Sequence, residues 1–261
     1  MLIMLDLDGT LLDNQSKITT KTKTYIKSLK DKGHQIVLIT GRPYRGCIDY
    51  YNELNLDAPL VCDNGASIYG MGHFPNIFHR IPKTLLDEIY QFSKDHIETA
   101  FYSVDDDLYA IKPQLRLSFY FHLNKDSKII KKPYDELDVL APLLMIVIKK
   151  PFDQTFEKFI ASKEILALRS WGSDKKNAIY EVYLKGIHKG NALNEVKQAL
   201  GVKEVIAFGD GDNDVELLSN ACLGIAMRNA SDSVILASDQ QTTYTNNEDG
   251  VIKHLKTIIK D

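Results

Sequence analysis

The sequence predicts an α/β protein whose core is a doubly wound parallel sheet, with a second α+β unit inserted into it. Two observations predict this class. Towards both ends of the chain, short apolar runs alternate singly with helical patterns, which is the order that joins parallel strands through right-handed crossovers. Between about residues 82 and 186 this alternation stops, and strand patterns follow one another.

The first part of the chain carries three strand patterns and two helix patterns. The strand patterns are "LIMLD", "HQIVLIT" and "PLVCDNGA", apolar runs bounded by turn residues, as is typical of strands buried on both faces. The helix patterns lie at 19–33, which ends on the stop signal Gly33, and at 44–55. The resulting order of strand, helix, strand, helix, strand predicts a parallel sheet.

The same alternation returns after Gly186. We expect helices at 189–201, 214–221 and 250–260, and strands at 205–210 and 223–227. Together with the first part, these elements predict a Rossmann-like core domain made of residues 1–81 and 187–261.

The insert, residues 82–186, has the mixture expected of an α+β domain with an antiparallel sheet. Helix patterns lie at 83–96 and 153–163. Strand patterns lie at 99–104, 108–112, 116–123, 143–150, 165–171 and 178–184. The first two of these strands flank the acidic turn "DDD" and are predicted to form a hairpin.

Composition limits the partners and the compartment. The 261 residues have a net charge of −3, so no basic field draws the protein to nucleic acid or to an anionic membrane. The three widely spaced cysteines favour reduced thiols over a disulfide framework. No apolar run approaches the roughly 20 residues that span a bilayer. We therefore expect a cytoplasmic protein, monomeric by default, with neither nucleic acid nor membrane as partner.

Three of the predicted core strands end in polar residues. In an open parallel sheet, ligands bind at the carboxyl ends of the strands, so these residues are expected at one rim, near the helix start at Lys189. The strand-end residues are Asp6 and Asp8 in "DLDGT", Thr40, Gly41 and Arg42 in "ITGRP", and Asp210, Asp212, Asn213 and Asp214 in "FGDGDND".

Each motif alone has a simpler reading as turn or N-cap residues, and Lys189 alone reads as a solvated lysine. Together they indicate a site, because carboxylates from separate strand ends repel one another unless a cation lies between them. Hard oxygen ligands suit Mg²⁺, which also binds phosphate. Thr40, Lys189 and the amides around Leu7 and Gly41 would hold phosphate oxygens. This set of groups fits phosphoryl transfer.

In this order, "DLDGTLLD", "ITGR", "KG" and "GDGDND" resemble the four motifs of the haloacid dehalogenase superfamily. The insert resembles, in length and pattern, the α+β (type IIB) cap of its Cof-type phosphatases. "CDNGASIY", "IHKGNAL" and "GIAMRNA…NNEDGV" are further matches. One departure is Arg228, which stands where the tail motif usually has glycine and is expected to alter the adjacent loop.

The resemblance implies the roles of the carboxylates. Asp6 would be the nucleophile that forms an aspartyl-phosphate. Asp8 would protonate the leaving alcohol and then activate water, with its backbone carbonyl on the metal. Asp210 would be the remaining protein ligand of Mg²⁺, while Asp214 would support the metal's waters and orient Lys189.

The resemblance also implies the residues that hold phosphate and substrate. Asn213 would join Leu7, Thr40, Gly41 and Lys189 around the phosphate. Arg42 and Asn64 would face the entrance and contact the substrate. Asp212 stands at a variable position and is read as a solvated turn residue.

The implied function is Mg²⁺-dependent hydrolysis of small phosphorylated metabolites. Sugar phosphates are the commonest substrates that the resemblance implies, and flavin or pyridoxal phosphates are others. The alternatives are a phosphomutase, a phosphatase of sugar-phosphate conjugates, or a non-catalytic phosphate-binding regulator of the same fold.

Overall fold

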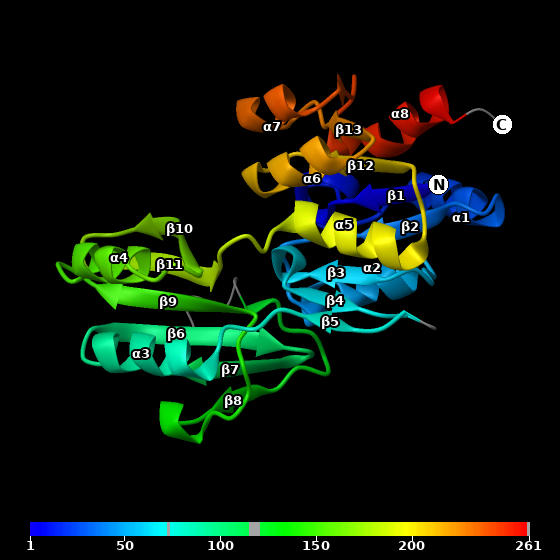
Figure 1. Ribbon diagram of the computed structural model, residues 1–261. Helices are drawn as coiled ribbons and strands as arrows, with labels where there is room; N and C mark the ends of the chain where they lie inside the picture. The colour runs from blue at the N-terminus through cyan, green and yellow to red at the C-terminus, as the bar shows by residue number, and fades with distance from the viewer. Residues whose placement is uncertain (72–73, 115–120, 260–261) are drawn as a thin grey trace. The chain divides into compact units, whose positions relative to one another are not determined.

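The computed structural model describes residues 1–71, 74–114 and 121–259. The chain forms two compact units (Figure 1). The first contains residues 1–41, 47–77 and 188–261, and the second contains residues 42–46 and 78–187.

The first unit is built on a parallel sheet. Its strand order is β14-β13-β12-β1-β2, and each pairing between these strands is parallel, with Met4 of β1 opposite both Val37 and Ala207. The predicted parallel core sheet is therefore confirmed. The strands are β1 (Leu2–Leu5), β2 (Gln35–Leu38), β12 (Val205–Gly209), β13 (Leu223–Ala226) and β14 (Gln240–Gln241).

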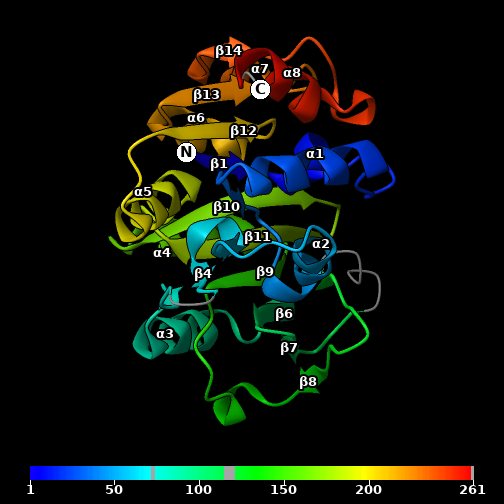
Figure 2. The same ribbon diagram turned by 90° about the vertical axis from the view of Figure 1, so that its right-hand side faces the viewer.

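Helices cover both faces of this sheet. Figure 2 shows α5 and α6 on one side of β1 and β12, and α1 and α8 on the other. All four residues of β1 are fully buried, as a strand between two helical layers requires. The helices are α1 (Thr20–Asp31), α2 (Ile48–Glu53), α5 (Lys189–Leu200), α6 (Val215–Asn220), α7 (Asp232–Ala237) and α8 (Gly250–Ile258).

The third predicted strand lies differently from expectation. It forms β3 (Leu60–Cys62), which pairs with β4 (Ser67–Tyr69) in a separate sheet of order β3-β4-β5, with β5 at Ile77–Phe78. A single parallel bridge between Ile39 and Val61 ties it to the end of β2. After β3 the chain reverses direction, because Asp63 and Asn64 have φ of 52° and 55° and lead directly into the antiparallel strand β4.

The second unit is built on a sheet of order β10-β11-β9-β6-β7-β8. Its pairings are antiparallel, as predicted, except that β7 and β8 run parallel. The predicted hairpin is confirmed, with Val104 opposite Asp107. The predicted strand at 116–123 falls largely on residues 115–120, outside the described residues. The strands are β6 (Ile97–Val104), β7 (Asp107–Ile111), β8 (Ile129–Lys131), β9 (Leu143–Lys149), β10 (Leu166–Ser173) and β11 (Asn177–Leu184).

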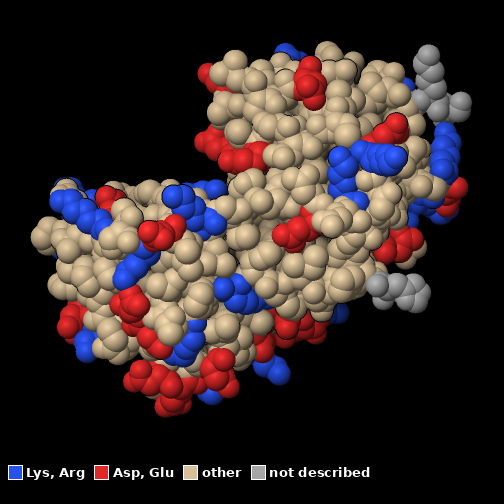
Figure 3. All heavy atoms as spheres, in the orientation of Figure 1, with Lys and Arg blue, Asp and Glu red and all other residues tan. Residues whose placement is uncertain are grey.

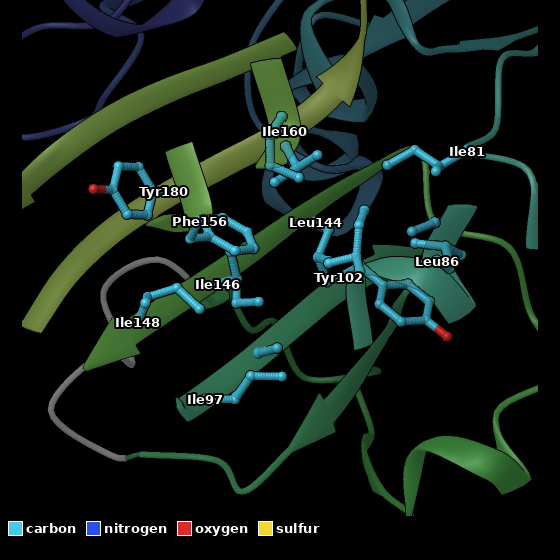
Figure 4. Close-up of a cluster of buried hydrophobic side chains, with 14 of the residues drawn as sticks. Ile81, Leu86, Ile97, Tyr102, Leu144, Ile146, Ile148, Phe156, Ile160 and Tyr180 are labelled. Carbon is cyan, nitrogen blue, oxygen red and sulfur yellow. The ribbon is translucent and has the colours of Figure 1, made fainter. Parts of the chain in front are cut away.

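Helices α3 (Lys83–Ser93) and α4 (Asp153–Ala161) close one apolar core with this sheet. Figure 4 shows Leu86 of α3 and Phe156 of α4 with Ile146 of β9 in this cluster. All three side chains are almost fully buried. The second unit therefore has a hydrophobic core of its own, as an independent domain requires.

The surface agrees with the balanced composition. Figure 3 shows basic and acidic side chains interspersed over one face of the molecule. Within the part of the chain that the structure describes, no helix has both the length and the apolar character needed to cross a membrane. The three cysteines are free thiols, and Cys47 and Cys62 lie buried with their Sγ atoms 3.2 Å apart.

Candidate active site

Asp6 lies at the carboxyl end of the central strand. Its backbone N–H donates to the carbonyl of Phe208 at 3.1 Å, which holds the end of β1 beside the end of β12. Its side chain is only 5% exposed. The following turn, Leu7–Leu11, carries Asp8 with an exposed side chain and Gly9 with φ of 76°. The two neighbouring aspartates therefore lie in different environments.

Asp214 is fixed at the end of the adjacent strand by its own loop. Its Oδ2 accepts hydrogen bonds from the backbone N–H groups of Asp210 and Gly211, at 3.0 and 3.1 Å. Its side chain has no exposed surface. This arrangement caps the short 3₁₀ turn Asp212–Asp214 and satisfies two backbone donors that the turn leaves without a partner.

Lys189 joins the ends of the two strands. It is the first residue of α5, follows the N-cap His188, and is fully buried. Its Nζ donates to Asp6 Oδ1 and to Asp214 Oδ1, both at 2.6 Å. The alternative reading of Lys189 as a solvated lysine is wrong.

Asp210 is the third carboxylate of the cluster. Thr10 Oγ1 donates to its Oδ1 at 2.8 Å. Asn229 Nδ2 donates to the carbonyl of Gly9 at 2.7 Å and lies 3.5 Å from Asp210 Oδ2. A Cβ on Gly9 would stand 2.1 Å from Asp210 Oδ2, so only glycine leaves room for this carboxylate.

Thr10 and Asn229 are site residues that the sequence did not predict. Both belong to the motifs "DLDGT" and "GIAMRNA", but hydroxyl and amide side chains are also common in plain turns. Next to Asn229, Arg228 is exposed and its Nη1 donates to the carbonyl of Thr243 at 3.3 Å. Arg228 therefore contributes to the loop and leaves Asn229 in contact with the cluster.

Three carboxylates converge in this region. One oxygen each of Asp6, Asp210 and Asp214 lies within 4.8 Å of the others. Ionised, they carry three negative charges against the single positive charge of Lys189, which leaves a balance of −2. Hard oxygen donors with this excess of negative charge fit a divalent cation.

The pKa shifts of these residues agree with an excess of negative charge. Burial raises the pKa of Asp6 well above its usual range, the charge of Asp214 adds to this, and Lys189 opposes it. Burial, aided by the charge of Asp214, raises the pKa of Asp210 to about 6, against the hydrogen bond from Thr10. Burial alone would lower the pKa of Lys189, but the charges of Asp214 and Asp6 outweigh it and raise that pKa. Strong shifts in one cluster are typical of functional sites.

A second group of predicted residues lies around the end of β2. Thr40 is buried, and its backbone bonds to Val61 and to Asn64. Asn213 Nδ2 donates to Asn64 Oδ1 at 2.9 Å, and a Cβ on Gly41 would meet that same Oδ1 at 3.0 Å. The predicted phosphate residue Asn213 is thus joined directly to the predicted substrate residue Asn64.

Two further predicted residues, Arg42 and Asp212, make other contacts. Arg42 belongs to the 42–46 segment of the second unit, where its Nη1 donates to the carbonyl of Gly46 at 3.0 Å. Asp212 is exposed, as predicted, and its Oδ1 accepts from Ser231 Oγ at 2.8 Å. Its bond to Ser231, the N-cap residue of α7, makes Asp212 a turn residue in this structure.

Comparisons with known proteins agree with this fold and cluster. Residues 3–255 match the haloacid dehalogenase-like hydrolase family. A Bacillus subtilis 5-amino-6-(5-phospho-D-ribitylamino)uracil phosphatase is 31% identical over 98% of this chain and 96% of its own. An Escherichia coli pyridoxal phosphate phosphatase is 25% identical over 89% of each chain.

Solved structures show the same architecture. A Thermotoga maritima protein has a TM-score of 0.85, with 25% identity over 100% of this chain and 98% of its own. A sugar phosphatase of haloacid dehalogenase subclass IIB has a TM-score of 0.77 and 23% identity over 98% of both chains. The chain belongs to the haloacid dehalogenase-like hydrolases. It is a phosphatase of that family, with the α/β core and α+β cap architecture of the superfamily.

We predict that Gly9→Ala disturbs the cluster beyond its effect on the backbone. The φ of 76° makes alanine strained, by about 1–2 kcal/mol, and the new Cβ would also displace the Asp210 carboxylate. Urea unfolding and phosphate release measure the two effects. The matched control is Gly33→Ala, at a φ of 83° with no described atom within 4 Å of the added Cβ. If both variants lost stability equally and both kept full activity, the close approach of Asp210 to Gly9 would be contradicted.

We predict that Lys189→Met lowers the free energy of unfolding by about 3–5 kcal/mol, because it leaves two buried carboxylates without their cation. Urea denaturation at pH 7 in EDTA measures this. The control is Lys27→Met, which removes a 2.7 Å ion pair with Asp31 at an exposed site, where the expected change is about 0.5 kcal/mol or less. Equal losses of unfolding free energy in the two variants would show that the Lys189 bridge stabilises the fold no more than an exposed ion pair does.

Proposed function

We propose that this phosphatase is a Mg²⁺-dependent phosphomonoester hydrolase that acts on small phosphorylated metabolites through an aspartyl-phosphate on Asp6. The observation that carries the proposal is the buried cluster of Asp6, Asp210 and Asp214, whose charge Lys189 balances only in part. A divalent cation would neutralise the remaining two charges.

The hydrogen bonds support different roles for the three carboxylates around the metal ion. Both oxygens of Asp214 already accept hydrogen bonds, from Lys189 and from two amides, so we assign it to the waters around the ion. Lys189 bonds to Oδ1 of Asp6, and Thr10 bonds to Oδ1 of Asp210. We assign the direct ligands to the carboxylates of Asp6 and Asp210 and the carbonyl of Asp8. Bound there, Mg²⁺ would screen the repulsion between Asp6 and a phosphate dianion.

Asp6 and Asp8 then have different roles in the reaction. A carboxylate oxygen of Asp6 attacks phosphorus, and the bond from phosphorus to the substrate oxygen breaks as Asp8 gives that oxygen its proton. Asp8, now ionised, takes a proton from a water that attacks the phosphorus of the aspartyl-phosphate. The bond from phosphorus to the Asp6 oxygen breaks as the water attacks, phosphate leaves, and both carboxyl groups return to their starting state. The burial of Asp6 and the exposure of Asp8 support these different roles.

The phosphate would be held by donors from three strand ends. We assign Thr40, the amides of Leu7 and Gly41, Lys189 and Asn213 to its oxygens. The bond from Asn213 to Asn64 supports placing Asn64 beside the phosphate group. Because phosphoryl transfer depends mainly on positioning and charge stabilisation, a rigid set of donors is what the reaction needs.

The relatives support the substrate class. One is named for a phosphate on a D-ribityl chain and another for pyridoxal phosphate. We therefore propose small organic monophosphates, with sugar and sugar-alcohol phosphates first. We assign their recognition to a cap domain of residues 82–186, with Arg42 and Asn64 as substrate contacts, in a cytoplasmic monomer.

We predict that Asp6→Asn lowers phosphate release by about 10³-fold or more, because an amide is a poor nucleophile. Phosphate is measured with Mg²⁺ on a panel of sugar, sugar-alcohol, pyridoxal and p-nitrophenyl monophosphates. Asp212→Asn, in the exposed turn of the same rim, is the control and should match the wild type. Comparable turnover by Asp6→Asn would refute the nucleophile, and a wild type inert on the whole panel would refute the substrate class.

We predict that EDTA abolishes hydrolysis and that Mg²⁺ restores it. Asp210→Ala should raise the Mg²⁺ concentration for half-maximal activity by at least about tenfold, because it removes a carboxylate ligand. A Mg²⁺ titration of activity measures this, with Asp212→Ala as control. An unchanged titration for Asp210→Ala would exclude it as a ligand, and full activity in EDTA would exclude the metal.

A further inference from the structure

The short segment 42–46 belongs to the second unit, although the residues on both sides of it belong to the first. Gly41, before it, follows Thr40, and Cys47, after it, leads into α2. Thr40 and Cys47, which bracket the segment and Gly41, are held within the first unit. Thr40 bonds through its backbone to Val61 and Asn64, and Cys47 is fully buried. The chain therefore leaves the first unit directly after the predicted phosphate residues and returns a few residues later.

Arg45 is what holds this segment in the second unit. Its side chain is only 2% exposed. Its guanidinium donates through Nε to the carbonyl of Phe121 at 2.7 Å, through Nη2 to the same oxygen at 2.5 Å, and through Nη1 to the carbonyl of Asp107 at 3.3 Å. Asp107 begins β7, and Phe121 is itself buried in the second unit's core, where its ring packs edge-on against Phe101.

The backbone of the segment is held as well. Asn124 Nδ2 donates to the carbonyl of Arg45 at 3.2 Å. Gly46 N donates to the carbonyl of Pro43 at 2.8 Å, and a Cβ on Gly46 would stand 3.0 Å from the Cβ of His122. The segment is thus a tight turn packed closely on the second unit.

A buried guanidinium is costly unless its donors are satisfied, and a shorter apolar residue would fill a core position without that cost. The guanidinium instead fixes a geometry, because its planar set of N–H donors holds the carbonyls of Phe121 and Asp107 in the second unit at set positions relative to residues 42–46. We propose that Arg45 is a positioning residue, which anchors the chain after Thr40 and Gly41 to the second unit and so sets the position of the phosphate-binding backbone. The proposal rests on the proposed function for the role of Thr40 and Gly41.

The test compares Arg45→Met and Arg45→Lys with Arg80→Met. Arg80 is also an arginine of the second unit, and it donates to the carbonyl of its neighbour His79 outside the 42–46 segment. Hydrogen exchange of the amides in residues 40–47 reports anchoring directly. Calorimetry with inorganic phosphate and Mg²⁺ reports the phosphate site, and kcat and KM for p-nitrophenyl phosphate report turnover.

For Arg45→Met we expect faster exchange in residues 40–47 and about tenfold weaker phosphate binding, with KM raised more than kcat is lowered. Arg45→Lys should be intermediate, because an ammonium can donate to one carbonyl but cannot bridge the carbonyls of Phe121 and Asp107 as the guanidinium does. Arg80→Met should match the wild type. Wild-type exchange and phosphate affinity in a folded Arg45→Met would overturn the proposal, as would equal changes in Arg80→Met.

If Arg45→Met does not fold, Asn124→Ala carries the test. It removes the bond to the Arg45 carbonyl, together with the bonds of the Asn124 side chain to Asp106, Asp126 and Ser127. It should speed exchange of residues 44–47 in a folded protein, and unchanged exchange there would overturn the anchor. A wild type without phosphatase activity would contradict the proposed function instead, while exchange in residues 40–47 would still decide the role of Arg45.

Discussion

The double hydrogen bond of the buried Lys189 is the constraint on which the rest of the core depends. Its Nζ lies 2.6 Å from carboxylates of two neighbouring strand ends, and these carboxylates belong to residues 183 and 25 positions away along the chain. A lone buried ammonium would lose its proton, and lone buried carboxylates would gain one. Lys189 and the two carboxylates therefore depend on one another, and because the fold brings them together, the site and the sheet topology are specified together.

Lys189 can reach the carboxylates because the backbone packs closely against neighbouring atoms at two glycines. Gly190, beside the bridging lysine, faces the carbonyl of Glu216, and a Cβ there would stand 2.5 Å from that oxygen. The close packing of α5 on α6 lets the ammonium reach the carboxylates of β1 and β12. Gly9 likewise lies directly under Asp210. The glycines of "KG" and "DLDG" thus serve the same site as the charged residues beside them.

Much of the fold and of the candidate site could be predicted from the sequence, because the patterns that indicate them lie within short stretches of the chain. The apolar runs and their alternation with helices indicate the parallel sheet, and its topology brings "DLDGT" next to "FGDGDND". What escaped prediction depends on contacts between distant segments or on backbone dihedrals. The reversal after β3 depends on two residues with positive φ, and Thr10 and Asn229 have roles only because Asp210 lies beside them. Residues 44–55 look like one helix, yet α2 begins only at Ile48 and Tyr44–Gly46 forms a separate 3₁₀ turn, in which Arg45 donates to the carbonyl of Phe121 within the second unit.

The opening motif places two carboxylates two residues apart, and the structure shows why they do not behave alike. Asp6 has extended dihedrals, with φ of −66° and ψ of 160°, and continues the line of β1 into the buried cluster. The turn after it directs the Asp8 side chain to an exposed position. Burial makes charge expensive at Asp6, and the bond from Lys189 opposes that cost. A carboxylate with little water around it is a better nucleophile than a solvated one, whereas an exposed side chain is accessible to water and to a leaving group. This asymmetry, which follows from one strand end and one turn, supports the proposed roles of Asp6 as nucleophile and Asp8 as its acid–base partner.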